Sequence, residues 1–198
     1  FNPGKITDAP KMDDRELFRF APGYEVEDFD SVLDWAAWPG AAGGFQGAVE
    51  MCNNNGACRK LSGGVMCPSY RATRNERDAV RGRANSLRLA MSGQLGPGAM
   101  ASDEMAETMK LCVSCKACKR ECPVGVDMAR MKVEVTAARA AKHGIPLHDS
   151  LIGNLPAYAP LASGLSGLSN LVQSVWRHVP GLTSLVSRLT GFTTKRSL

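Results

Sequence analysis

The sequence lacks the hallmarks of membrane-spanning, secreted and nucleotide-binding proteins. It contains no run of eighteen apolar residues, and no basic region followed by an apolar stretch at its N-terminus, so neither a transmembrane helix nor a signal peptide is predicted. The Gly-x-Gly-x-x-Gly and phosphate-loop lysine patterns are both missing, and no Ser, Cys or His grouping indicates hydrolysis. We therefore expect a location inside the cell, in the cytoplasm or peripherally at the inner face of the membrane.

The chain also lacks a cysteine content suited to disulfides, because seven is an odd number and no secretory signal accompanies it. Four of the seven fall within residues 111–127, separated by two, two and three residues and followed at once by Pro123. They are Cys112, Cys115, Cys118 and Cys122. Bacterial ferredoxins bind iron–sulfur clusters with this spacing, and the cysteine before the proline ligates a second cluster elsewhere. The motif therefore predicts a second cysteine group.

The second group lies upstream and consists of Cys52, Cys58 and Cys67, the last again followed by proline. Asn55 stands where the middle thiol of a three-ligand run is expected. Exchange of the pre-proline cysteines, as in ferredoxins, predicts two clusters. A complete 4Fe-4S cluster is expected on Cys67, Cys112, Cys115 and Cys118, and a second cluster on Cys52, Cys58 and Cys122. The second is either 3Fe-4S, or 4Fe-4S with water or Asn55 on its fourth iron.

Zinc is the rival metal, because it also binds four thiolates and pairs of Cys-x-x-Cys. Zinc sites are usually built from two separated pairs, whereas this chain has one tight run of four and an incomplete copy. The pattern therefore favours iron–sulfur clusters over zinc.

Charge is unevenly distributed along the chain, which has a net charge of +5. Residues 1–50 hold ten acidic and four basic side chains, while residues 51–198 hold nine acidic and twenty basic ones. A basic region can bind nucleic acid, but a thiolate-bound cluster is itself anionic and is partly neutralised by nearby cations. We expect the basic side chains to compensate the negative charge of the clusters, and we expect no nucleic-acid partner.

The predicted fold is mainly α, a helical-ferredoxin-type domain with two clusters and an extended, irregular N-terminal arm. Residues 1–42 form the proline-containing arm, and residues 43–150 form the cluster domain. Trp35 and Trp38 either anchor the arm or take part in simple packing, and the second role is the one favoured. A short helix is expected in residues 43–51, ahead of the first cysteine. The interval between Cys67 and Cys112 predicts two capped helices, where a β-sheet ferredoxin would have strands and turns.

Apolar periodicity and capping residues place these helices. Thr73 and Glu76 form a capping box, and an apolar stripe follows at spacings of four, three and four. Ser102 and Asp127 are predicted to cap two further helices. The stripe consists of Val80, Ala84, Leu87 and Met91, and the opposite face carries Arg74, Arg77, Arg81, Arg83 and Arg88, which we interpret as a solvated face.

Residues 151–198 are rich in Leu, Ser and Gly, with two apolar stripes typical of amphipathic helices. The first consists of Leu165, Leu168, Val172, Val175 and Val179, and the second of Leu182, Leu185, Val186 and Leu189. Three roles are open for these stripes: packing on the cluster domain, covering a further domain, or peripheral contact with a membrane surface.

Several segments resemble a known family. These are CRKLSGGVMCPSY, ERDAVRGRAN, LCVSCKACKRECPVGVDMARMKVE and LIGNLPAYAPLAS, within residues 43–165. They resemble the iron–sulfur region of the large flavin- and iron–sulfur-containing D-2-hydroxyacid dehydrogenases, of the D-lactate and D-2-hydroxyglutarate type. The segment FNPGKITDAP is similar to the tail of the flavin-linked oxidase domain in such proteins.

The resemblance implies a function and a set of partners. It implies an FAD domain before residue 1 and a cysteine-rich domain after residue 198, with electrons relayed singly from reduced FAD to a quinone or an electron-transfer protein. We also expect this protein to form homo-oligomers. Lys116, Lys119, Arg120 and backbone amides of the Gly56 and Gly63 loops are candidate modulators of cluster potential. Two alternatives are a separate iron–sulfur subunit, as in succinate dehydrogenase or heterodisulfide reductase, and a structural metal scaffold.

Overall fold

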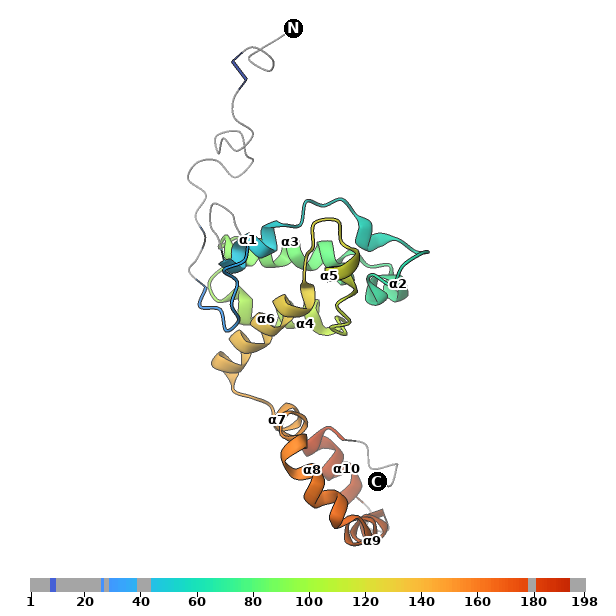
Figure 1. The fold of residues 1–198 in the computed structure, drawn as a ribbon. Helices are drawn as coiled ribbons and strands as arrows, with labels where there is room; N and C mark the ends of the chain where they lie inside the picture. Colours follow the sequence, from blue (N-terminus) through green and yellow to red (C-terminus); the bar gives the residue numbers. More distant parts are fainter. Residues whose placement is uncertain (1–7, 10–25, 27–28, 39–43, 178–180, 193–198) are drawn as a thin grey trace. The chain divides into compact units, whose positions relative to one another are not determined.

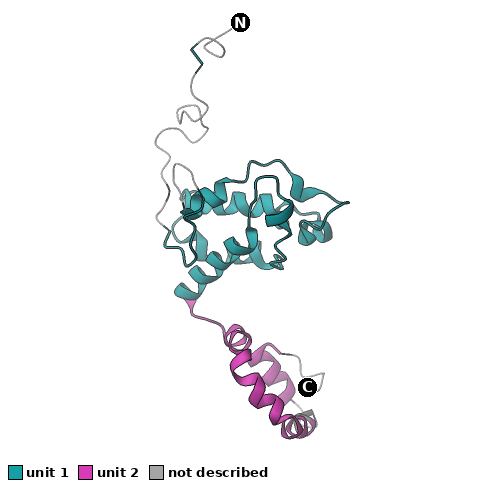
Figure 2. Cartoon of the chain, in the orientation of Figure 1, with its two compact units in different colours: residues 1–142 teal, residues 143–198 magenta. Residues whose placement is uncertain are grey.

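The computed structural model describes residues 8–9, 26, 29–38, 44–177 and 181–192. Every regular element within these residues is a helix, which confirms the predicted fold class (Figure 1). The chain divides into two units, residues 1–142 and 143–198 (Figure 2). The boundaries predicted after residues 42 and 150 stay predictions, and residues 1–7, 10–25, 27–28 and 39–42 of the predicted arm lie outside the described part.

Unit 1 contains six α-helices and three short 3-10 helices among its described residues. The α-helices are α1 (Gly44–Glu50), α2 (Pro68–Thr73), α3 (Val80–Met91), α4 (Asp103–Lys110), α5 (Ala117–Glu121) and α6 (Met128–His143). The 3-10 helices span Ala57–Arg59, Glu76–Asp78 and Ala99–Ala101. The helix expected before the first cysteine is confirmed as α1.

Helix α3 lies at the centre of unit 1 and packs against α1 and α4 (Figure 1). Its apolar stripe, Val80, Ala84, Leu87 and Met91, is buried, as the spacing predicts. Through this stripe α3 packs in the same core as the buried cysteines.

Two of the predicted caps are present. The Ser102 hydroxyl accepts the N–H of Met105 at 3.1 Å at the start of α4, and the Asp127 carboxylate accepts the N–H of Arg130 at 3.2 Å at the start of α6. Such caps satisfy backbone donors that have no partner within the helix.

The predicted capping box of Thr73 and Glu76 is wrong. Thr73 ends α2, and its hydroxyl donates to the Ser69 carbonyl at 3.1 Å. Asn75 caps instead, since its side chain accepts the N–H of Arg77 at 3.0 Å. The reason is that Arg74 has a left-handed conformation, φ 59°, which ends α2 and separates it from the following helices.

The end of the arm is held on α6 by a buried carboxylate. Glu134 is fully buried and accepts the backbone N–H groups of Val32 and Leu33, each at 2.9 Å, and the indole N–H of Trp35 at 2.7 Å. The Arg130 guanidinium lies 4.6 Å from the Trp35 ring centroid and 5.2 Å from that of Trp38. Trp35 and Trp38 therefore pack against α6, and their role in anchoring the arm stays a prediction.

Unit 2 consists of α7 (Leu147–Gly153), α8 (Leu155–Gly164), α9 (Ser166–Arg177) and α10 (Leu182–Thr190). Its predicted apolar stripes leave large side chains in solvent, including Leu165, Leu168, Leu185 and Leu189, each at least half exposed. The Val179 of the predicted stripe lies outside the described residues. Among the described helices of the whole chain, none has the length and apolar character needed to cross a bilayer.

Candidate metal centre

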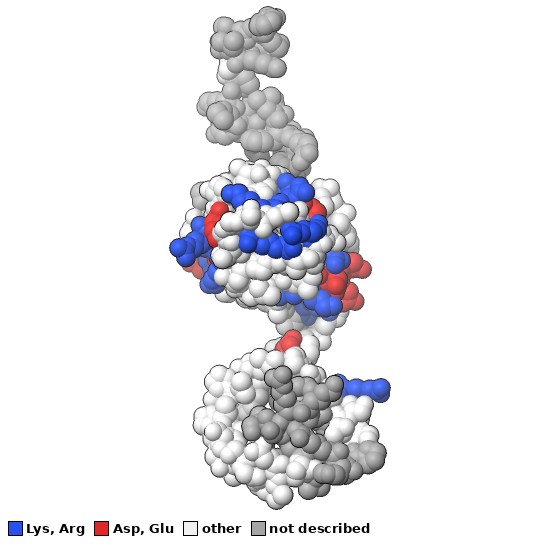
Figure 3. Space-filling model, turned by 90° about the vertical axis from the view of Figure 1, so that its right-hand side faces the viewer, with Lys and Arg blue, Asp and Glu red and all other residues white. Residues whose placement is uncertain are grey.

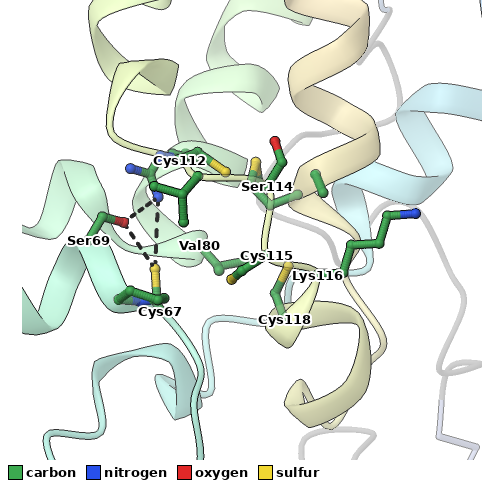
Figure 4. Close-up of a pocket in the computed structure, with 13 residues that line it drawn as sticks. Cys67, Ser69, Val80, Cys112, Ser114, Cys115, Lys116 and Cys118 are labelled. Atoms are coloured by element: carbon green, nitrogen blue, oxygen red, sulfur yellow. Dashed lines mark hydrogen bonds between the residues drawn. The ribbon is translucent and has the colours of Figure 1, made fainter. Parts of the chain in front are cut away.

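Four cysteines from two separate segments of the sequence line one pocket in unit 1. Cys112, Cys115 and Cys118 come from the loop between α4 and α5 and the start of α5, and Cys67 comes from the residue before α2. The pocket has a volume of about 330 Å³, including space open to solvent. Figure 4 shows the four sulfur atoms around this space, with the Lys116 side chain pointing away from it. The structure thus brings together the four residues predicted to hold the complete cluster.

The seven cysteines all lie within the described residues, and all are free thiols. Within the same residues, no group of three or more His, Cys, Asp or Glu side chains is placed to hold a metal ion. The four sulfurs instead surround a space, and a four-iron cluster bound by four cysteines takes its ligands from around its own volume. The donor set therefore fits the predicted cluster.

The two cysteine loops share one backbone conformation. The residue two after the first cysteine is left-handed in both, with φ 62° at Asn54 and φ 53° at Ser114. The residue four after it is left-handed as well, with φ 78° at Gly56 and φ 57° at Lys116. A short helix then starts in each loop and carries the next cysteine, Cys58 or Cys118, into the core. The loops are therefore structural repeats, as the incomplete copy in the sequence predicts.

The start of a helix donates a backbone N–H to the last cysteine of each loop. Burial raises the pKa of the Cys118 thiol, and hydrogen bonds from the N–H groups of Met128 and Ala129, at the start of α6, lower it. Burial also raises the pKa of Cys58, which the N–H of Arg81, 3.4 Å away at the start of α3, lowers. Hydrogen bonds of this kind stabilise a thiolate, the form that ligates metal.

The remaining predicted ligands are Cys52, Cys58 and Cys122. Cys52 and Cys58 are both buried in the core of unit 1. Cys122 is half-buried at the end of α5, against the same core. This ligand set stays a prediction.

Glu121, next to Cys122, joins the second cysteine motif to the segment that precedes Cys67. Its carboxylate accepts the N–H groups of Val65 at 2.7 Å and Met66 at 2.9 Å. These two hydrogen bonds, in that order, lower the pKa of the Glu121 carboxyl. They hold the segment before Cys67 against the second motif, which places Cys67 at the pocket.

Asn55 occupies the position that Cys115 has in the other loop. Its amide oxygen accepts the N–H of Ala57 at 2.8 Å, and its amide nitrogen donates to Asn53 at 2.7 Å. The side chain is exposed and closes a local turn. Asn55 thus maintains the loop conformation without a thiol, and its role as a fourth ligand stays a prediction.

The interpretation of Arg74, Arg77, Arg81, Arg83 and Arg88 as a solvated face is wrong for the three that lie on α3. Arg83 is 1% exposed and lines the pocket. Arg81 is half-buried and pairs with Glu76 at 2.7 Å, and Arg88 donates to the Cys52 carbonyl at 3.0 Å. The helical period contains a signal for Arg83, because it lies three residues after Val80 and four before Leu87, on the buried face.

The lysines and arginine named as candidate modulators lie differently. Lys116, Lys119 and Arg120 are exposed, and the Lys119 ammonium lies 5.3 Å from the ring centroid of Trp38. Figure 3 shows Lys and Arg side chains gathered on one face of unit 1. Water and salt screen these surface charges, so their effect on the pocket is small compared with that of a buried charge.

Comparison with known proteins identifies similar sequences but no similar structure. Residues 48–126 match the family model of the 4Fe-4S dicluster domain. The D-2-hydroxyglutarate dehydrogenase of Pseudomonas putida is 28% identical over 88% of this chain and 20% of its own length. That of Escherichia coli is 26% identical over 81% of this chain and 18% of its own length. That of Pantoea ananatis is 28% identical over 64% of this chain and 16% of its own length.

The chain therefore has distant homology, over most of its length, to proteins of which it spans about a fifth. No solved structure matches the chain.

Proposed function

We propose, from a 4Fe-4S dicluster domain and distant homology to D-2-hydroxyglutarate dehydrogenases, that this chain is the electron-transfer segment of a flavin-dependent D-2-hydroxyacid dehydrogenase. The observation that carries the proposal is the convergence of Cys67 with Cys112, Cys115 and Cys118 on one pocket. Three of these thiols come from the second motif and one from the first, which is the exchange of ligands typical of two-cluster ferredoxins.

The residues of this chain would bind and tune two clusters. Cys67, Cys112, Cys115 and Cys118 would hold a 4Fe-4S cluster, and Cys52, Cys58 and Cys122 a 3Fe-4S cluster or a 4Fe-4S cluster completed by water or Asn55. Iron–sulfur clusters, when bound, accept and donate single electrons. The N–H groups of Met128, Ala129 and Arg81 would hydrogen bond to ligand sulfurs and so favour a more reduced cluster.

The proposal places the chain between two partners. A flavin-linked domain would remove two electrons from a D-2-hydroxy acid, and an external acceptor, a quinone or an electron-transfer protein, would receive them one at a time. A cysteine-rich domain and further copies of the chain complete the proposed assembly. The names of the relatives support the substrate class, since each is a D-2-hydroxyglutarate dehydrogenase.

Anaerobic purification followed by iron, sulfide and zinc analysis tests the proposal. We expect about seven or eight irons per chain with a similar amount of acid-labile sulfide, and EPR signals from two clusters on stepwise reduction. Zinc in place of iron, with no sulfide, would overturn it. Clusters that cannot be reduced in a biological range would favour a structural scaffold instead.

A further inference from the structure

A buried arginine lines the pocket of the four cysteines. The Arg83 side chain, on α3, is 1% exposed. Its Nε donates to the Thr108 carbonyl at 2.9 Å. Its Nη1 donates to the Asp78 carbonyl at 2.6 Å and to the Ser69 hydroxyl at 3.1 Å, and it lies 3.8 Å from the Cys67 sulfur. Dashed lines in Figure 4 end at the labelled Ser69 and Cys67 for these two contacts, and the Arg83 side chain is drawn there without a label. The guanidinium is therefore fixed beside a proposed ligand.

The charge of Arg83 is only partly compensated by the protein. Arginine stays protonated in proteins, and the buried carboxylate of Asp78 lies 3.9 Å from Nη2. Both Nη2 and the Oδ1 of Asp78 lack a hydrogen-bond partner among the described residues. Arg83 lines the pocket and Asp78 does not. The positively charged member of this ion pair is therefore the one that faces the cysteines. A buried charge needs a compensating partner, and an anionic thiolate-bound cluster would be one.

We propose that Arg83 raises the reduction potential of the cluster held by Cys67, Cys112, Cys115 and Cys118. This inference rests on the proposed function. Reduction adds one negative charge to the cluster, and a nearby cation stabilises that charge. Because Arg83 is buried, water and salt screen its field far less than that of the exposed Lys116, Lys119 and Arg120.

A purely structural role makes a different prediction. Arg83 also joins three segments of the core through Ser69, Asp78 and Thr108, so its loss could disturb the pocket without any electrostatic effect. A lysine at this position keeps the charge but cannot reproduce the planar set of hydrogen bonds. A glutamine keeps polar contacts but removes the charge. The potential should therefore follow the charge, and the stability should follow the hydrogen bonds.

The test is an EPR-monitored redox titration of the full chain, purified anaerobically, in the variants Arg83→Gln and Arg83→Lys. We expect Arg83→Gln to lower the reduction equilibrium constant of this cluster by at least about tenfold, or 59 mV for one electron. Arg83→Lys should stay within about threefold of the wild-type constant. The control Arg88→Gln, on the same helix beside the Cys52 carbonyl, should leave this cluster unchanged.

A second variant covers the case in which Arg83→Gln does not assemble its cluster. Asp78→Asn keeps the arginine and removes its counter-charge, so we expect the reduction constant to rise by at least about threefold. The inference is overturned if Arg83→Gln or Asp78→Asn assembles the cluster and titrates at the wild-type potential. It is also overturned if Arg83→Gln and Arg83→Lys shift the potential equally. Wild-type protein without clusters would overturn the proposed function itself.

Discussion

The two cysteine loops have the same backbone conformation but different numbers of thiols. Asn54 and Gly56 match Ser114 and Lys116 in their left-handed conformations, and both loops end in a cysteine that a helix start hydrogen bonds. One loop has a thiol at its middle position, and the other has Asn55. The comparison shows that the same backbone conformation forms with and without a thiol at the middle position, where the Asn55 amide accepts the N–H of Ala57 and donates to Asn53.

The largest effect is expected when a cysteine that precedes a proline is replaced by alanine. Cys67→Ala should remove a ligand from the complete site and abolish that cluster, with loss of about half of the iron and sulfide. The matched variant Cys122→Ala should remove the other cluster instead. Iron analysis and EPR distinguish the two losses. A Cys67→Ala protein that keeps the signal of the four-cysteine cluster would show that the ligand exchange is wrong.

A smaller effect is expected when the missing thiol is supplied. Asn55→Cys places a cysteine where the other loop has Cys115, so the second cluster should acquire a fourth thiolate. We expect its loss of iron on exposure to air to slow by several-fold, measured as decay of its EPR signal. The matched control is Asn53→Cys, which adds a thiol two residues earlier. Equal decay rates in the two variants would contradict the loop equivalence.

The smallest effect concerns the left-handed residues of the loops. A side chain in this conformation costs about 1–2 kcal/mol, and glycine costs about 0.5–1 kcal/mol in conformational entropy. Lys116→Gly should therefore increase the free energy of unfolding by about 0.5–1 kcal/mol, and Gly56→Ala should decrease it by about 1 kcal/mol. A Cβ atom added at Gly56 would meet only the Arg81 guanidinium, at 3.5 Å, so the cost there is one of backbone conformation.

Urea midpoints at equal cluster content, under anaerobic conditions, measure both changes. If the two substitutions shift the midpoint in the same direction, the loops do not share their backbone conformation.

Local sequence signals predicted much of the fold and part of the site. The spacing of Val80, Ala84, Leu87 and Met91 predicted α3, and Ser102 predicted the start of α4, because period and capping depend on neighbouring residues. The thiol spacing likewise predicted that Cys67 joins the second motif at one pocket. The wrong prediction of a capping box shows the limit of such local signals. Arg74 adopts a left-handed conformation that ends α2 at Thr73, so Thr73 does not cap the helix that follows.

The polar core could not be predicted in the same way. Glu134 and Arg83 are charged residues within helices, which are most often exposed. Their burial depends on partners far along the chain: backbone N–H groups of the arm for Glu134, and the Asp78 and Thr108 carbonyls for Arg83. Sequence periodicity identifies a face of a helix but does not identify which distant backbone groups meet it.

The first two turns of α6 make two sets of contacts within a few residues of each other. Met128 and Ala129 direct their amides at the Cys118 sulfur, while Arg130 and Glu134 grip the tryptophan segment of the arm. Residues 32–35 and the Cys118 sulfur thus accept or donate hydrogen bonds at positions six residues or fewer apart on one helix. The described end of the arm and the Cys118 sulfur therefore contact the same two turns of one helix.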